Sequence, residues 1–101
     1  MHIYRQGDVL LVEREQLPER VQKQKDCILA HGEATGHHHQ VKENGVMWVD
    51  VNEAGRRYLE ITADTAVVHE EHAPIALKGP AVFEVIIQRS YTPEGIVNVR
   101  D

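Results

Sequence analysis

The residues best suited to chemistry in this sequence are its histidines, which gather in two short segments. Of seven histidines, six fall within HGEATGHHH and HEEH. They are His31, His37, His38 and His39 in the first segment, and His69 and His72 in the second. Imidazole exchanges protons near neutral pH and is a common metal ligand. The two segments therefore predict one reactive site if the fold places them side by side.

The first segment has the spacing of metal ligands on a strand. If residues 37–42 are extended, His37 and His39 point to the same face, about 6.6 Å apart. Two imidazoles at that spacing can converge on one cation, with each ring nitrogen about 2.1 Å from it. Glu43 follows at the next turn and could add a carboxylate.

The second segment offers further ligands. His69 and His72 are three residues apart, so they can reach one point from the end of a strand, and Glu71 stands between them. We predict four histidines and one carboxylate as metal ligands: His37, His39, His69, His72 and Glu43. The predicted catalytic residues are His37, His39, His69, His72 and Glu71.

Two chemistries fit such a site. Neutral imidazoles with a carboxylate suit a divalent Zn, Fe, Mn or Ni ion, and an open coordination position would activate a water molecule. Without a metal, one imidazole could deprotonate a ribose 2′-hydroxyl while another protonates the leaving oxygen, as in a phosphodiesterase. That route needs a cation for the phosphate, and Lys78 and Arg89 are candidates, with Lys42 and Arg5 as alternatives. A third possibility is a module that binds metal or protons without catalysis.

Ordinary structural roles compete with these interpretations. An isolated imidazole is usually a surface residue, and we interpret His2 and His38 in this way. His31 could either join the site or cap the strand 26–31. Glu70 and Glu71 together are typical of a solvated acidic pair. We expect Trp48 to lie in the core.

Short apolar runs separated by Gly and Pro indicate the elements that must position these residues. Runs rich in Val and Ile cover 8–13, 26–31, 37–42, 46–51, 57–62, 65–69 and 81–90. This pattern predicts an all-β fold, a small barrel or sandwich of short antiparallel strands that forms a single domain over residues 1–101.

Two local predictions accompany this fold. Asn44-Gly45 between two apolar runs predicts a hairpin of residues 37–42 with 46–51. The polar stretch 13–25 is interrupted by Pro18, so we expect a loop or one turn of helix there.

The composition of the chain excludes several classes of binding partner. The chain has 101 residues and a formal net charge of −5, which argues against binding to long nucleic acids. A single cysteine, Cys27, excludes a disulfide framework, and no apolar run is long enough to cross a membrane. The first residues lack the apolar segment of a signal peptide. We therefore expect a cytoplasmic protein with a small-molecule or small-nucleotide ligand, and a homodimer that protects an exposed strand edge.

Four motifs resemble a family of small uncharacterised bacterial and phage proteins. They are RQGDVLLV, GEATGHHH, HEEHAPI and KGPAVFEVIIQRSY, which together follow the pattern TGHxH, HxEHxPI and QRxY. The matching positions are Gln6, Gly7, Asp8, Thr35, Gly36, His37, His39, His69, Glu71, His72, Pro74, Ile75, Gly79, Gln88, Arg89 and Tyr91.

This resemblance covers most of the chain and adds ligand contacts. We predict Lys78, Arg89, Gln88 and Thr35 as ligand-binding residues, and of these Thr35, Gln88 and Arg89 are among the matching positions. Small β-rich proteins beside type III CRISPR loci include ring nucleases, which degrade cyclic oligoadenylates. The phosphodiesterase alternative therefore extends to small or cyclic RNA.

A weaker resemblance links the chain to the cupins, which are metal-binding β-barrels. Gly32 followed by His37-x-His39-x3-Glu43 is similar to their first motif. The second motif departs from theirs, because the chain has His69-x2-His72-x-Pro74 where a cupin has Pro-x-Gly-x2-His. The leading prediction is a small cupin-like metal-binding enzyme or metalloprotein.

Overall fold

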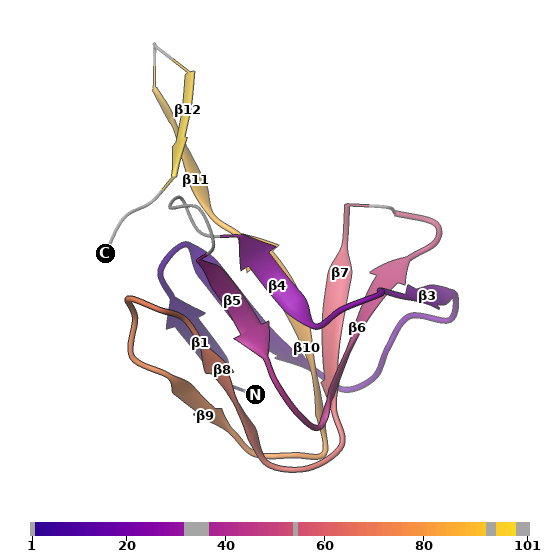
Figure 1. Cartoon of the computed structure of the whole chain (residues 1–101). Coiled ribbons are helices and arrows are strands. Elements are labelled where there is room, and N and C mark those ends of the chain that lie inside the picture. Colours follow the sequence, from indigo (N-terminus) through magenta and orange to yellow (C-terminus); the bar gives the residue numbers. More distant parts are fainter. Residues whose placement is uncertain (1, 32–36, 54, 93–94, 99–101) are drawn as a thin grey trace.

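A computed structural model shows two antiparallel sheets that face each other and a separate two-stranded ribbon (Figure 1). The structure describes residues 2–31, 37–53, 55–92 and 95–98, with side chains as far as Gln88. The strands are β1 (Ile3–Gln6), β2 (Val9–Arg14), β3 (Val21–Lys23), β4 (Ile28–His31), β5 (His38–Val41), β6 (Gly45–Asp50), β7 (Arg57–Ile61), β8 (Thr65–Val68), β9 (Ile75–Leu77), β10 (Ala81–Ile87), β11 (Arg89–Thr92) and β12 (Gly95–Asn98).

The architecture confirms the all-β prediction in its sandwich form. One sheet has the order β1-β2-β10-β7-β6-β3 and the other has the order β4-β5-β8-β9. Each sheet is open, so the fold is not a closed barrel. In the part of the chain that the structure describes, no helix is long and apolar enough to cross a membrane.

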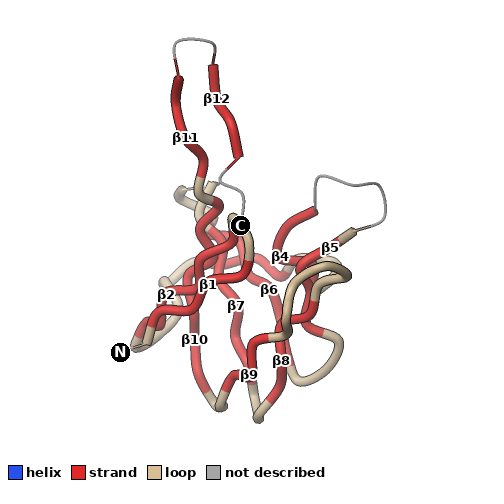
Figure 2. Tube along the Cα trace, turned by 90° about the vertical axis from the view of Figure 1, so that its left-hand side faces the viewer, coloured by secondary structure: helices blue, strands red, loops and turns tan. Residues whose placement is uncertain are grey.

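All seven apolar runs form strands, because alternating β-branched residues suit a sheet that is buried on one side. The polar stretch 13–25 contains the short strand β3 and no helix. The run 81–90 is divided at Gln88, where β10 ends, and the chain continues into the ribbon of β11 and β12. This ribbon projects away from the sandwich in both views (Figures 1 and 2).

The predicted hairpin around Asn44-Gly45 is wrong. Strand β5 pairs with β4 and β8, whereas β6 pairs with β3 and β7, so this turn carries the chain from one sheet to the other. Asn44 does adopt the left-handed conformation that the motif predicts, with φ 60°. A side chain at Gly45 would lie 2.9 Å from Cγ1 of Val41 and 3.3 Å from Cδ1 of Leu59. A glycine is therefore needed here because the backbone passes close to the side chains of the core, and not because a hairpin turn requires it.

The core lies between the two sheets and receives side chains from both. Its buried members are Val9, Leu11, Leu29, Val41, Met47, Leu59, Ile61, Val67, Leu77, Phe83 and Val85. Trp48 is not among them. It is half-buried on β6, where its Nε1–H donates to Glu60 Oε1 over 3.0 Å.

Strand pairing brings the two histidine segments to one end of the sandwich. Strands β5 and β8 are antiparallel neighbours with Gln40 opposite Val68, so the start of β5 lies beside the end of β8. The β1–β2 turn lies at the same end, in the upper left of Figure 1.

A buried carboxylate occupies the middle of β10. Glu84 is 6% exposed and accepts hydrogen bonds from Arg14 over 2.8 Å and from Arg56 over 3.2 Å. Burial by itself would raise the pKa of Glu84, but the hydrogen bonds from Arg56 and Arg14 outweigh it and hold that pKa below the ordinary value of 4.5. The ionised carboxylate therefore stabilises the fold at neutral pH.

We predict that this stabilisation disappears in acid. A lowered pKa in the folded state means that the contribution is complete above pH 4.5 and is lost as the pH falls below it. Glu84→Gln should therefore lower the free energy of unfolding at pH 7 and reduce the dependence of that free energy on pH below 4.5. Urea denaturation across this pH range measures both effects. The exposed Glu19→Gln serves as control, and an equal slope in both variants would contradict the assignment.

Candidate functional site

Four histidines from the two segments form a single group of rings, here called the histidine cluster: His37, His39, His69 and His72. The centroid of the His69 ring lies 4.3 Å from that of His39 and 4.6 Å from that of His72. The His37 ring is edge-on to His69 at 5.8 Å. The structure thus brings together all four histidines that the sequence singles out, and their segments are neighbours.

The amide of Gln6 at the end of β1 orders the buried side of the cluster. Its Nε2 donates to the carbonyls of Val67 over 3.1 Å and Ala73 over 2.9 Å. Its Oε1 lies 2.8 Å from Nδ1 of His39, whose side chain is only 3% exposed. Since Nε2 of Gln6 is the atom that donates to both carbonyls, Oε1 faces His39, and because an amide oxygen only accepts, Nδ1 of His39 carries the proton.

Gly7 allows the β1–β2 turn to approach the rings closely. It has φ +60°, which L side chains rarely adopt. A Cβ at this position would lie 3.2 Å from Cε1 of both His39 and His72. The next residue, Asp8, places Oδ1 3.8 Å from Nε2 of His39. The turn therefore adds a carboxylate to the cluster that spacing between histidines did not indicate.

His69 lies at the centre of a second set of contacts. Its Nδ1 accepts the backbone N–H of Glu71 over 3.0 Å and lies 3.0 Å from Nδ1 of His72. Burial, followed by the neighbouring His72 ring, lowers the pKa of His69 below its ordinary value of 6.5. The ring is therefore mostly neutral at pH 7, with its lone pair on Nδ1, where it accepts the Glu71 N–H.

Three ligand atoms lie close enough to hold one metal ion. One ring nitrogen each of His37 and His69 and a carboxylate oxygen of Glu70 lie within 4.8 Å of one another. Glu70 Oε1 also accepts the backbone N–H of His38 over 2.7 Å, and this bond holds the pKa of Glu70 below its ordinary value. The carboxylate is therefore ionised and fixed in direction.

The structure favours Glu70 over Glu71 as the ligand carboxylate. Both glutamates are exposed, but Glu70 has its carboxylate held by the His38 N–H and close to ring nitrogens of both His37 and His69. Glu71 Oε1 is 3.7 Å from Nδ1 of His37, and its side chain is 65% exposed. Glu71 is thus at the rim of the cluster, where we expected a catalytic group. From the sequence we interpreted Glu70 as part of a solvated pair, because alternation alone does not show which of two adjacent carboxylates points toward the histidines.

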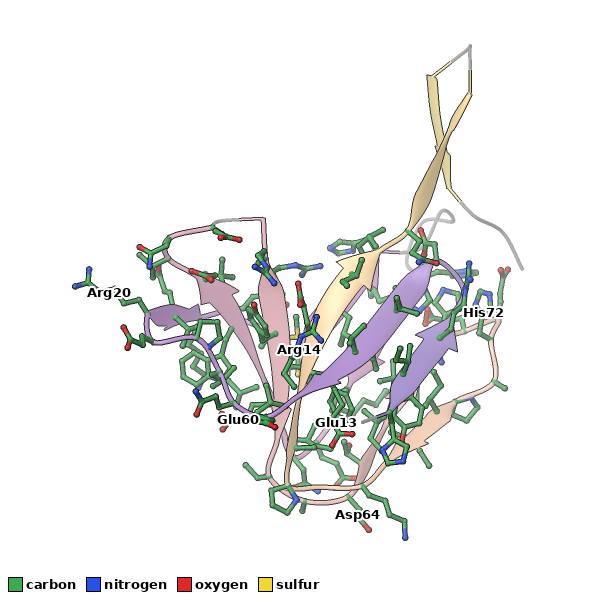
Figure 3. All side chains as sticks on the ribbon, turned by 180° about the vertical axis from the view of Figure 1, so that it is seen from behind. Glu13, Arg14, Arg20, Glu60, Asp64 and His72 are labelled. Atoms are coloured by element: carbon green, nitrogen blue, oxygen red, sulfur yellow. The ribbon has the colours of Figure 1, made fainter. Side chains whose placement is uncertain are left out.

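Two predicted site residues, Glu43 and Lys78, lie at the opposite end of the sandwich. The carbonyl of Glu43 accepts a hydrogen bond from Thr65, the first residue of β8, while the histidines follow its last residue. Lys78 follows Leu77, which pairs with Thr65. In Figure 3, Asp64, the neighbour of Thr65, lies at the bottom of the molecule, well away from His72. Neither Glu43 as a metal ligand nor Lys78 as a ligand contact is brought to the cluster.

The other three residues predicted to bind a ligand are Gln88, Thr35 and Arg89. Gln88 is half-buried and its backbone N–H donates to the carbonyl of Asp8 over 2.8 Å, so it lies next to the cluster turn. Thr35 lies outside the described residues, and Arg89 belongs to β11, whose side chains are not described. His38 faces His31 as the opposite member of a strand pair, with 3.1 Å between their Nδ1 atoms.

An open hollow adjoins the cluster. It has a volume of about 280 Å³ and is lined by Arg5, Gln6, Gly7, His72 and Ala73. The Nε–H of Arg5 donates to the carbonyl of Gly7 over 3.1 Å, which places a guanidinium at its edge. Small anions are the ligands that such an edge attracts.

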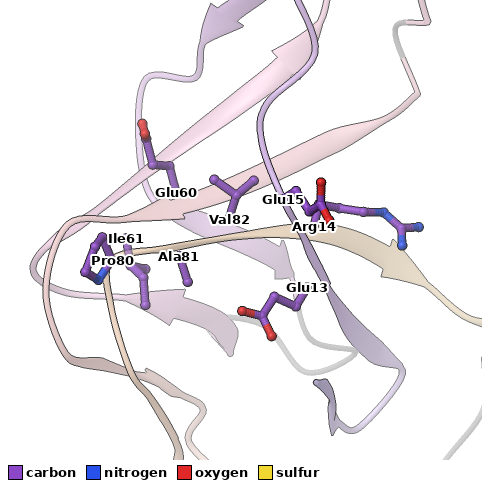
Figure 4. Close-up of a pocket in the computed structure, with 8 residues that line it drawn as sticks. All are labelled: Glu13, Arg14, Glu15, Glu60, Ile61, Pro80, Ala81 and Val82. Carbon is purple, nitrogen blue, oxygen red and sulfur yellow. The ribbon is translucent and has the colours of Figure 1, made fainter. Parts of the chain in front are cut away.

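A second hollow lies elsewhere on the six-stranded sheet. It measures about 410 Å³ and is lined by residues of β2, β7 and β10 and the chain next to them: Glu13, Arg14, Glu15, Glu60, Ile61, Pro80, Ala81 and Val82 (Figure 4). It lies by the Arg14 end of β2, whereas the histidine cluster lies by the Val9 end. It carries none of the histidines.

Gly7 provides a test of the close approach between turn and rings. Gly7→Ala forces a Cβ into a left-handed residue against two imidazoles, so the free energy of unfolding should fall by about 1–2 kcal/mol. Gly55→Ala, where nothing lies within 4 Å, is the matched control and should change stability by less than about 0.5 kcal/mol. Urea denaturation compares them. Equal midpoints would show that the turn does not pack on the cluster as described.

Comparison with known proteins adds a family but no activity. Neither the curated proteins nor the solved structures contain a significant match to this chain. One family model matches residues 5–88, from the second half of β1 to the residue after β10, and so includes the β1–β2 turn and both histidine segments. The chain belongs to the family described as a domain of unknown function, DUF8820.

Proposed function

We propose that the protein is a metalloprotein that binds a divalent transition-metal ion through His37, His69 and Glu70. The observation that carries this proposal is the convergence of their three ligand atoms within 4.8 Å of one another. Ligand atoms bonded at about 2.1 Å to one ion must lie within roughly twice that distance of one another, so small side-chain rotations would complete the site. Two imidazoles and a carboxylate suit Zn, Fe, Mn or Ni.

His72 supports the central ligand. Nδ1 of His69 accepts the backbone N–H of Glu71, so in its 3.0 Å contact with Nδ1 of His72 the hydrogen is donated by the His72 ring. His72 therefore helps to orient His69 and is not needed as a ligand of the same ion.

Three protein ligands leave coordination positions for water or substrate. A metal with such an open position acts as a Lewis acid and lowers the pKa of a bound water. The Arg5 guanidinium at the adjoining hollow favours a small anionic ligand. The function that fits best is metal-assisted chemistry on a small anionic molecule. A cupin-like assignment extends only to the kind of ligand, because Glu43 lies at the other end of the fold.

A second candidate function needs no metal. The lowered pKa of His69 keeps this ring neutral at pH 7, as a general base requires. Together with Arg5, the cluster then supports the phosphodiesterase alternative, in which small or cyclic RNA is cleaved. A sensor of metal without catalysis remains the third alternative.

We predict that the chain binds Zn²⁺ or Co²⁺ after it has been purified without a histidine tag and stripped with EDTA. Glu70→Gln keeps the oxygen that accepts the His38 N–H but loses the charge, so it should weaken metal binding at least tenfold, as should His37→Gln. The exposed His2→Gln is the control. Calorimetric titration gives the affinities, and elemental analysis gives the stoichiometry.

Metal binding should also raise the melting temperature. An ion present at 100 times its dissociation constant adds about 2.7 kcal/mol to stability. If none of Zn²⁺, Co²⁺, Mn²⁺, Ni²⁺ or Fe²⁺ binds or shifts the melting temperature, the metalloprotein proposal fails. Cleavage of a cyclic oligoadenylate that persists in EDTA and is lost in His69→Gln would then establish the phosphodiesterase.

A further inference from the structure

The ribbon of β11 and β12 lacks the strand neighbours that a stable sheet needs. In the part of the chain that the structure describes, these two strands pair only with each other, from Arg89 opposite Asn98 to Thr92 opposite Gly95. The ribbon projects away from the sandwich in both views, so neither sheet covers it (Figures 1 and 2). A two-stranded hairpin is at best marginally stable in water, whereas three or more strands can be stable. A stable ribbon therefore requires strands from another molecule.

The ribbon is also separate from the part of the chain that builds the sandwich. The buried cluster of the described core extends from Val9 to Val85. The family model ends at Gln88, immediately before β11 begins. A role in association is therefore compatible with a sandwich whose two sheets are held together by residues that precede the ribbon.

The free edge of β12 carries none of the features that usually prevent strand pairing. Natural edge strands are protected by charged side chains, lysine above all, or by proline. In the six-stranded sheet, the edge strand β1 contains Arg5 and the edge strand β3 ends with Lys23. Strand β12 has the sequence GIVN, with neither a charge nor a proline, whereas β11 begins with Arg89. The edge of β12 is therefore open to another strand.

The distribution of charge favours a second copy of the chain at this edge. Residues 1–88 contain nine basic and 14 acidic residues and so carry the whole net charge of −5, whereas residues 89–101 contain two of each. Two acidic sandwiches repel each other, but two ribbons do not. A second copy also presents the same uncharged edge, and a two-fold axis pairs one surface with an identical one.

We propose that the β12 edges of two copies pair antiparallel around a two-fold axis, so that the protein forms a homodimer. The two ribbons then make one four-stranded sheet in the order β11-β12-β12-β11, in which backbone N–H and C=O groups bind across the axis. The contact is small, so we expect a weak dimer with a dissociation constant in the micromolar range. None of the proposed metal ligands takes part, and the dimer does not depend on the proposed function.

This pairing also determines where the two histidine clusters lie in the dimer. Antiparallel pairing sets Gly95 of one copy beside Asn98 of the other. The ribbon joins the sandwich through Gln88, whose backbone N–H donates to the carbonyl of Asp8 in the β1–β2 turn. Each ribbon therefore begins at the histidine end of its own copy. The shared sheet places the two clusters at its opposite ends, directed toward each other.

Sedimentation equilibrium of the untagged full chain tests this dimer. Between about 1 and 300 µM the wild-type chain should show a monomer–dimer equilibrium. Ile96→Lys places like charges near the axis in both copies, so it should weaken the dimer by about tenfold or more. Ile3→Lys, at a 65% exposed position on the edge strand β1, is the matched control and should leave the dissociation constant within about twofold. A chain that stays monomeric, or a dimer lost in Ile3→Lys and kept in Ile96→Lys, overturns the proposal.

A charge exchange distinguishes a lost contact from a ribbon that fails to form. Ile96→Lys and Ile96→Glu should each be monomeric alone, and their mixture should form a heterodimer because opposite charges then meet across the axis. Amide hydrogen exchange of the wild-type chain adds a second measurement. The amides of residues 95–98 should exchange more slowly as the protein concentration rises. Dimerisation without such protection would place the contact on another surface and contradict the pairing of β12.

Discussion

The arrangement of the histidine end depends on one buried amide, that of Gln6. It belongs to β1 of the six-stranded sheet, yet its three hydrogen bonds go to His39 on β5, to Val67 on β8 and to the loop residue Ala73. A hydrocarbon side chain of the same size would leave two carbonyls and an imidazole N–H buried without partners, at about 1–3 kcal/mol each. The same amide therefore joins the two sheets and fixes the tautomer of the ring between them.

His69, at the centre of the histidine cluster, is held by local partners. The lowered pKa of His69 avoids a positive charge among neighbouring imidazoles. Its Nδ1 is used by the backbone of Glu71 and by His72. Among the described residues, three carboxylates lie around these rings, from Asp8, Glu70 and Glu71. Their negative charge attracts cations to this end of a chain that is acidic as a whole.

Function in this family must be argued from the site, because an antiparallel sandwich serves many unrelated activities. Two facing sheets supply rigid strand ends, and chemistry depends on the side chains that those ends present. Here one end presents the histidine cluster and the opposite end presents Glu43 and Lys78. The ligand set proposed above uses atoms from two segments that are far apart in the sequence, so neither segment could bind a metal in the same way by itself.

The sequence alone determined the properties that act over a few residues. Alternating apolar residues predicted seven strands because burial on one side of a sheet has a period of two. The preference of Asn44 for a left-handed conformation was also correct. The two histidine segments were identified by residue type and spacing, and Gln6, Gly7 and Asp8 were already part of the family pattern without a role.

Only the tertiary structure decided which strand ends meet. Asn44-Gly45 is equally suited to a hairpin or to a corner between sheets, and the burial of both flanking strands against one core selects the corner. That choice keeps Glu43 away from the histidines, while pairing of β5 with β8 turns Glu70 toward them. Which strands pair depends on how apolar faces from distant parts of the chain cover one another, and no local sequence pattern contains this information.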